Sequence, residues 1–237
     1  ASLCYLNKER YPFLLESVQH NDNNRYSILF AFPEKSIILH NFTDFNFLSE
    51  LEDQFKSNSI NTNLPFSGGW FVYLSYELIG QIEPILSKEL CVSELPIAYA
   101  VKIPSAIIID HKINTTYLID QAGDQNRIDT ILADIDRIKP IPEINVLGEL
   151  DQENEDKFIN GVKACLDYIV AGDVFQVNLS RQWLCKLTKE IDSAIIYHAL
   201  KSANPAPFSA LIQYENFGIV SSSPERLFSV QDGILQT

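Results

Sequence analysis

The residues best suited to catalysis stand near the end of the 237-residue sequence, in the stretch Ser221–Phe228 (SSSPERLF). Pro224 fixes its own backbone dihedral and lacks an amide hydrogen, so it predicts a bend or bulge in a strand that runs through this stretch. A bend re-aims the next side chain, and Glu225 could then point into a cleft as a general acid or base. The alternative is a solvent-exposed Glu225–Arg226 pair on a bent edge strand.

Other residue types that could do chemistry lack the required spacing. No GxGxxG, Walker, HExxH or GxSxG motif occurs, so the common nucleotide, metalloprotease and hydrolase signatures are absent. The histidines are far apart and are more typical of surface or core-edge positions than of catalysts: His20, His40, His111 and His198. The cysteines include no CxxC pair, which argues against zinc and favours free thiols in a reducing cytoplasm: Cys4, Cys91, Cys165 and Cys185.

Composition restricts the class of protein and of partner. With 46% hydrophobic and 21% charged residues, the chain has the make-up of a globular protein with a sizeable core. A formal net charge of −13 repels phosphate backbones and anionic lipid, so neither nucleic acid nor a membrane surface is expected as a partner. No apolar run approaches the ~20 residues of a spanning helix, and the first residues (ASLCYLNKERYPF) do not resemble a secretory signal.

The first part of the chain favours strands with one helix. Apolar residues from 45 to 55 recur at helical spacing, with Asp44 as a plausible N-cap. Gly68–Gly69 precedes an aromatic-rich run, which suits a strand that begins at a bulge or close approach. Two hairpin-like strand pairs are also expected, at 26–32 with 36–39 and at 105–110 with 115–119.

A boundary is expected after an amphipathic helix over 128–138, which Pro140 and Pro142 end. Residues 140–154 lose periodicity and read as a linker. Beyond it, we expect a helix that Gly172 ends, an alternating strand over 175–179, a helix over 191–203, and strands at 208–214 and from 218 onward. Strand runs with few intervening helices favour antiparallel sheets with helices outside, an α+β fold.

Five stretches, taken together and in order, resemble the chorismate-utilising enzymes, specifically component I of aminodeoxychorismate synthase. They span nearly the whole chain: Tyr11–Ser17 (YPFLLES), Gly68–Glu77 (GGWFVYLSYE), Ala171–Ser180 (AGDVFQVNLS), Asn204–Phe208 (NPAPF) and Ser222–Arg226 (SSPER). The resemblance implies a sandwich of antiparallel sheets with helices on the outside. It also implies that residues 1–140 form the family's N-terminal-like domain and that 150–237 begin its chorismate-binding domain.

The resemblance also implies a reaction, the conversion of chorismate and ammonia into 4-amino-4-deoxychorismate on the way to p-aminobenzoate and folate. Glu225 matches the acid that protonates the departing ring hydroxyl. The family's Mg²⁺ ligands, and a nucleophilic lysine in a PIKGT motif, would lie past the last residue. The 237-residue chain is therefore expected to be truncated and inactive alone. A glutamine amidotransferase is the expected partner, because the family takes its ammonia from one.

A second site follows from the same resemblance, a pocket that binds tryptophan in family members. The matching residues here are Ser17, Asn23, Asn24, Arg25, Tyr26, Pro207, Phe208 and Ser209. A hydroxyl and an amide could meet the ligand's ammonium and carboxylate groups, while Tyr26 and Phe208 flank its ring. The alternative is that these residues only pack the two sheets together.

Two other functions stay open. Anthranilate synthase component I is the nearest rival within the family. Three residues argue against it, because that enzyme usually has other residue types at the positions of Asn178, Ser209 and Arg226. From a different class, the chain could be a non-catalytic tryptophan-binding module built on this fold.

Overall fold

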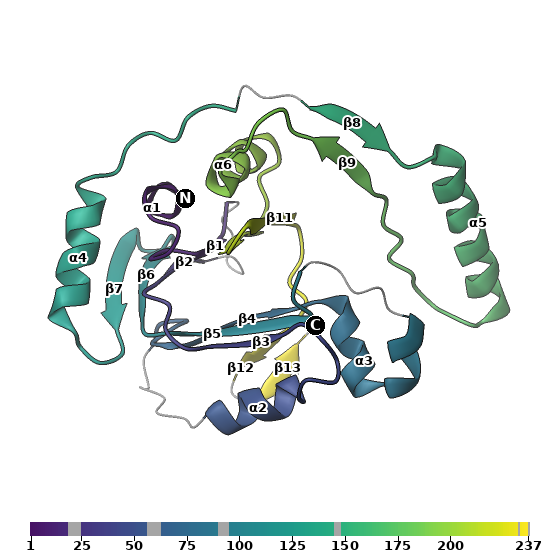
Figure 1. Ribbon diagram of the computed structural model, residues 1–237, viewed down its shortest axis with the longest axis horizontal. Helices are drawn as coiled ribbons and strands as arrows, with labels where there is room; N and C mark the ends of the chain where they lie inside the picture. Colours follow the sequence, from purple (N-terminus) through teal and green to yellow (C-terminus); the bar gives the residue numbers. More distant parts are fainter. Residues whose placement is uncertain (19–24, 56–62, 90–94, 145–147, 232, 237) are drawn as a thin grey trace. The chain divides into compact units, whose positions relative to one another are not determined.

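The computed structural model describes residues 1–18, 25–55, 63–89, 95–144, 148–231 and 233–236. These residues form two compact units (Figure 1). Unit 1 combines residues 1–143 with 192–237, and unit 2 is formed by residues 144–191.

Unit 1 contains a six-stranded antiparallel sheet in the order β11-β10-β1-β2-β6-β7. Strand β1 is central to it, pairing with β10 on one side and with β2 on the other. Late strands therefore join a sheet that the first residues begin. The strands are β1 (Phe13–Glu16), β2 (Tyr26–Ala31), β6 (Ser105–Asp110), β7 (Thr115–Asp120), β10 (Phe208–Tyr214) and β11 (Phe217–Ser223).

A three-stranded antiparallel sheet, in the order β3-β5-β4, packs on one face of the six-stranded sheet. Its strands are β3 (Ser36–Leu39), β4 (Gly69–Leu74) and β5 (Ala98–Ile103). Aromatic rings fill the space between the sheets: Phe13 of β1 stacks on Phe71 of β4 with centroids 4.1 Å apart, and Tyr99 of β5 meets Tyr214 of β10 at 4.6 Å. The predicted α+β sandwich of antiparallel sheets is confirmed.

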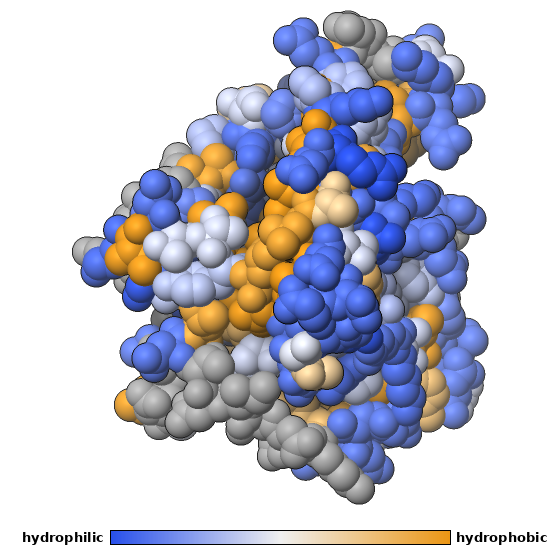
Figure 2. Space-filling view, turned by 90° about the vertical axis from the view of Figure 1, so that its left-hand side faces the viewer, coloured by the Kyte–Doolittle hydropathy of each residue, from blue (hydrophilic) through white to orange (hydrophobic). Residues whose placement is uncertain are grey.

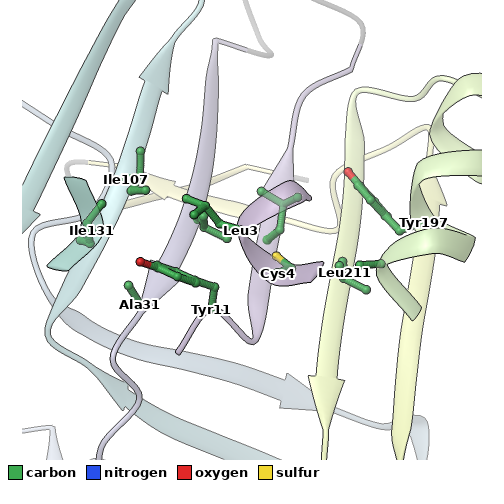
Figure 3. Packing of buried hydrophobic residues seen from close by; sticks show 11 residues of the cluster. Leu3, Cys4, Tyr11, Ala31, Ile107, Ile131, Tyr197 and Leu211 are labelled. Atoms are coloured by element: carbon green, nitrogen blue, oxygen red, sulfur yellow. The ribbon is translucent and has the colours of Figure 1, made fainter. Parts of the chain in front are cut away.

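Helices cover the outer faces of both sheets. On the six-stranded sheet lie α1 (Ser2–Leu6), α4 (Gln125–Ile135) and α6 (Ser193–Ala203). Figure 3 shows residues from these helices, among them Leu3, Ile131 and Tyr197, gathered over apolar residues of the strands. On the three-stranded sheet lie α2 (Phe47–Gln54) and the 3-10 turn η1 (Tyr76–Leu78), followed by α3 (Ile79–Ile82) and η2 (Pro84–Glu89).

The outer surface is mixed in polarity. Figure 2 shows the face at the left of Figure 1, where apolar side chains form a stripe between hydrophilic regions. Apolar atoms make up more than half of the surface of ordinary folded proteins. The stripe by itself therefore does not identify an interface.

Two expectations for the first part of the chain are wrong. Strands β2 and β3 do not form a hairpin, because β2 pairs with β1 and β6 whereas β3 pairs with β5 in the other sheet. Phe32, with φ of 57°, turns the chain between the sheets. Helix α2 is capped by Asn46, whose side chain accepts a hydrogen bond from the Ser49 amide, and not by Asp44. The hairpin of β6 and β7 is confirmed.

Unit 2 holds β8 (Glu149–Gln152), α5 (Glu155–Ala171) and β9 (Trp183–Lys186). Gly172 ends α5 with φ of 81°, a conformation that glycine adopts without strain, as predicted. Strands β8 and β9 pair only with each other among the described residues. The expected strand over 175–179 is wrong: these residues, all described, form no strand, because no strand of the described chain is available to pair with them.

The division into compact units differs from the division expected from sequence. The chain leaves unit 1 after Glu143, inside the expected linker, but it returns at Asp192 because α6, β10 and β11 pack with the first strands. The assignment of 1–140 and 150–237 to the two family domains stays a prediction. Among the described residues, no helix has the length and apolar character needed to cross a membrane.

Candidate functional site

Three of the predicted ligand residues meet at one end of the six-stranded sheet. Here β10 and β2 begin, at Phe208 and Tyr26, and β1 ends at Glu16. Ser17 continues between them: its hydroxyl donates to the Tyr26 carbonyl oxygen at 3.0 Å, and the next amide, that of Val18, donates to the Ala206 carbonyl at 3.1 Å. We call Ser17, Tyr26 and Phe208 the ligand row.

The aromatic members of the ligand row share the face that meets the three-stranded sheet. Side chains alternate along a strand, so Tyr26 lies on the face of Ile28 and Phe208 on the face of Ile212. Ile28 and Ile212 pack against the core between the sheets. Toward the row this face is less covered, because Leu15 is 39% exposed whereas Phe13, two residues earlier, is 0% exposed. The row therefore lies where the inter-sheet core becomes less covered, with Tyr26 and Phe208 half-buried and Ser17 7% exposed.

Arg25 anchors the start of β2. Its guanidinium donates to both carboxylate oxygens of Asp110, at 2.9 and 2.5 Å, and lies 4.8 Å from the ring centroid of Tyr26. The hydrogen bond from Arg25 holds the pKa of Asp110 below its ordinary value. This bidentate pair fixes Tyr26 in place. Arg25 is thus engaged with a carboxylate of the protein itself.

The remaining predicted ligand residues are not gathered on the row. Ser209 lies on the opposite face from Phe208, and its buried hydroxyl donates to the Ala206 carbonyl at 3.2 Å. Pro207, half-buried, precedes the strand. Asn23 and Asn24 lie outside the described residues.

A half-buried carboxylate that the sequence analysis did not single out, that of Glu16, lies beside the row. Glu16 accepts hydrogen bonds from the Tyr197 hydroxyl at 2.7 Å and from the Lys201 ammonium at 2.9 and 3.0 Å. Burial alone would raise the pKa of Glu16, but the bonds from Lys201 and Tyr197 outweigh it and the pKa lies below its ordinary value. Tyr197 and Lys201 are one helical turn apart on α6 and therefore share a face of the helix. This spacing was the only indication in the sequence that the two side chains could bind one carboxylate.

The acid segment, residues 224–228, follows β11. The strand was expected to run through SSSPERLF but ends at Ser223, because Pro224 cannot continue the ladder. The predicted bend at Pro224 is present. Glu225 is exposed, and its carbonyl accepts a hydrogen bond from the Ser223 hydroxyl at 3.0 Å. Its role as an acid stays a prediction.

The bend brings the acid segment to the ligand row. Ser223 pairs with Phe208 in the register of β10 and β11. Three residues after Ser223, the Arg226 guanidinium lies 5.3 Å from the centroid of the Phe208 ring. Nearby, the Ser222 hydroxyl donates to the Asn204 carbonyl at 2.5 Å. The SSPER and NPAPF stretches, 18 residues apart in the sequence, are therefore in contact. A strand pair, β12 (Ser229–Gln231) with β13 (Ile234–Gln236), follows.

The last question about the site is whether its side chains could bind a metal ion. Within the part of the chain that the structure describes, no group of three or more His, Cys, Asp or Glu side chains is arranged to hold a metal ion. We therefore derive no step through Mg²⁺ from these residues.

Comparison with known proteins gives a family match over most of the chain. A family described as chorismate binding enzyme matches residues 11–237. The chain is 30% identical over 233 residues to an "Anthranilate synthase component I-like protein" of Synechocystis sp., which covers 93% of this chain and 47% of that protein. It is also 30% identical over 199 residues to "Aminodeoxychorismate synthase component 1" of Bacillus subtilis, covering 77% of this chain and 42% of that protein.

A solved structure shares the fold. The crystal structure of anthranilate synthase component I from Streptococcus pneumoniae matches with a TM-score of 0.71 and 22% identity, covering 92% of this chain and 54% of that chain. At this identity the likeness concerns the fold alone. The chain spans about half the length of the relatives that it matches.

Proposed function

Because the chain belongs to the family of chorismate binding enzymes, we propose that it forms part of component I of an aminodeoxychorismate synthase. That enzyme converts chorismate and ammonia into 4-amino-4-deoxychorismate. The observation that carries the proposal is the family match over residues 11–237, with the SSPER stretch bent out of the sheet at Pro224. Named relatives include both synthases, so the choice between them rests on finer features.

The choice of aminodeoxychorismate synthase over anthranilate synthase rests on residue types at three positions. Asn178, Ser209 and Arg226 match component I of aminodeoxychorismate synthase better than they match anthranilate synthase. The alternative, anthranilate synthase component I, is supported by the names of several relatives.

The proposed step at Glu225 is a proton transfer. A bond forms between the ring carbon and the incoming nitrogen nucleophile, the ring carbon–oxygen bond breaks, and the Glu225 carboxyl gives its proton to the departing oxygen, which leaves as water. The proton that the nitrogen then loses restores the carboxyl. A positioned acid of this kind contributes about 10²–10⁴-fold to the rate. Glu225 is exposed in this chain. We propose that the half of the protein present in the longer relatives covers it.

The same half would bring the remaining chemistry. Mg²⁺, held there by carboxylates, would offset the charge of the chorismate dianion, since it is a hard ion that prefers oxygen ligands. A glutamine amidotransferase would supply ammonia as the partner subunit. A cytoplasmic location, expected from the unpaired cysteines, belongs to the same proposal; Cys4, Cys165 and Cys185 are free thiols in the described part of the chain.

Product identity tests the proposal. The polypeptide encoded by the complete reading frame should convert chorismate, ammonium and Mg²⁺ into aminodeoxychorismate, identified by mass spectrometry. Release of anthranilate with pyruvate would establish the rival instead. The Glu225→Gln variant should lose about 10²–10⁴-fold in kcat. The 237-residue chain alone should form no product, and appreciable turnover by it would refute that part of the proposal.

A second candidate function is the binding of tryptophan at the ligand row. The observation that favours it is the convergence of Ser17, Tyr26 and Phe208 where the inter-sheet core becomes less covered beside Leu15. Aromatic side chains that flank a partly covered apolar surface suit an aromatic ligand. Calorimetry of the 237-residue chain with L-tryptophan should show binding. An absence of heat together with an unchanged Tm would leave only a packing role for the row.

A further inference from the structure

A chain of hydrogen bonds fixes Ser17 from the side opposite the ligand row. The Ser17 amide donates to the Ser27 hydroxyl oxygen at 3.1 Å. The same oxygen is hydrogen-bonded to His111 Nε2 at 2.7 Å. His111 is itself placed by its backbone amide, which donates to the Arg25 carbonyl at 2.9 Å. His111, which the sequence alone assigns to the surface or the core edge, is therefore connected to Ser17 through one side chain.

The location of this network separates it from the row. Ser27 pairs with Ile109, and its side chain lies on the face of Leu29, which packs under the helices. Ser27 is buried, with 3% of its surface exposed, so its oxygen depends on protein partners. The Arg25–Asp110 pair holds the neighbouring residues on both strands. The network is thus part of a rigid frame at the start of β2.

Both hydrogen-bond donors of Ser17 are occupied, the amide by the network and the hydroxyl by the Tyr26 carbonyl. What the Ser17 side chain still offers is the pair of acceptor sites on its oxygen. An ammonium group, which only donates, fits this arrangement, whereas a carboxylate, which only accepts, does not.

We propose that Ser27 and His111 are positioning residues that hold Ser17 as a hydrogen-bond acceptor for the ammonium group of an aromatic amino acid bound at the ligand row. The ligand part rests on the second function proposed above, tryptophan binding. The positioning of Ser17 by Ser27 and His111 concerns the ligand-free chain and is tested independently of tryptophan binding. Removing His111 leaves the Ser27 hydroxyl without one partner, so the Ser17 amide loses a fixed acceptor.

The positioning is tested without any ligand. Amide hydrogen exchange at Ser17, followed by NMR on the 237-residue chain, should be accelerated about fivefold or more by Ser27→Ala and by His111→Ala, the loss expected from one hydrogen bond. His111→Gln, whose amide can reach Ser27, should stay within about twofold of the unsubstituted chain. His40→Ala is the matched control, since His40 is exposed after β3.

Two results would overturn the positioning. One is an unchanged Ser17 exchange rate in His111→Ala. The other is equal acceleration in the alanine and glutamine variants, which would show that any loss of the ring loosens this end of the sheet. Thermal unfolding of each variant is measured first. If the alanine variants are unfolded, His111→Gln carries the test: protection of the Ser17 amide in the folded variant supports the positioning, and loss of that protection overturns it.

The acceptor role is tested with three probes in calorimetry. L-Tryptophan and tryptamine, which carry the ammonium group, should bind, and indole-3-propionate, which carries only the carboxylate, should not. His111→Ala should weaken tryptophan binding about fivefold, and His111→Gln should restore it. Equal binding of indole-3-propionate and tryptophan would overturn the acceptor role. If none of the three binds while the exchange pattern holds, the tryptophan function falls and the positioning of Ser17 stands.

Discussion

The two compact units differ sharply in how they use their apolar residues. In unit 1, the six-stranded sheet is covered on one face by helices and on the other by a second sheet, and residues such as Phe13 and Tyr197 are wholly buried. In unit 2, α5 is described over its full length and has no buried residue, and Phe175 is 94% exposed. The strands β8 and β9 are exposed at every position.

The comparison shows that an apolar pattern specifies an element but not its partner. Helix α5 has caps at both ends, Asn154 and Gly172, and forms as predicted. Its residues nevertheless remain exposed or half-buried. The ligand row, by contrast, is assembled from elements that unit 1 supplies itself.

The largest difference is expected for a matched pair of aromatic substitutions. Phe13→Ala removes a ring that stacks on Phe71, and it should lower the free energy of unfolding by about 3–5 kcal/mol. Phe175→Ala in unit 2 should change it by less than about 0.5 kcal/mol. Urea denaturation measures both. Similar losses for the two variants would mean that Phe175 is packed.

A smaller difference is expected for buried and exposed ion pairs. Asp134 on α4 is buried and accepts hydrogen bonds from Arg10 and from the Tyr11 hydroxyl, the latter at 2.9 Å. Asp134→Ala leaves those donors without their acceptor and should lower the free energy of unfolding by about 2 kcal/mol.

The control for this prediction is Lys157→Ala in unit 2. Lys157 pairs with Glu153 but its side chain is 75% exposed. Its removal should lower the free energy of unfolding by less than about 0.5 kcal/mol. A larger effect of Lys157→Ala than of Asp134→Ala would reverse the comparison.

The pH dependence of stability should reveal Glu16. Its pKa is lower in the folded chain than in the unfolded chain, so its contribution is present above its ordinary pKa and is lost as the pH falls through the folded value. Lys201→Met removes the ammonium partner and should destabilise the chain by about 1–2 kcal/mol at pH 7.

The difference between Lys201→Met and the unsubstituted chain should vanish in acid, where Glu16 is protonated in both. Urea denaturation over a series of pH values measures it, with Lys163→Met on α5 as the control. A destabilisation that persists unchanged below about pH 3 would show that Lys201 acts through packing and not through its charge.

The mildest test compares the alkylation rates of one cysteine in each unit, Cys4 in unit 1 and Cys185 in unit 2. Burial raises the pKa of Cys4 on α1 to about 11, and its side chain is inaccessible, whereas Cys185 on β9 is exposed. Iodoacetamide at pH 7 should therefore alkylate Cys185 about a hundredfold faster than Cys4. Mass spectrometry of timed samples resolves the two sites. Equal rates would indicate that α1 detaches readily from the sheet.

Much of the fold could be predicted because its signals are local. The β6–β7 hairpin has two β-rich runs separated by a short turn, and α5 has its glycine stop. Sheet partners are not local. Strand β3 joins a different sheet from β2, although only four residues lie between them. The alternating residues 175–179 have no strand beside them in the described chain.

The candidate site was predictable in part for the same reason. The sequence identifies Ser17, Tyr26 and Phe208 by resemblance, and the structure brings them together. It gives no indication that Ser209 faces the helices, because that depends on the register of β10 against β1. Glu16 and His111 were missed because their partners, Lys201 and Ser27, are 185 and 84 residues away in the sequence.

The central claim is that unit 1 is packed by its own residues whereas unit 2 is not. Hydrogen exchange of the 237-residue chain, resolved along the sequence, tests it most directly. Amides of β1, β2 and β10 should be protected close to the level of global unfolding, and those of α5 should exchange orders of magnitude faster. Protection of α5 equal to that of β1 would contradict the claim.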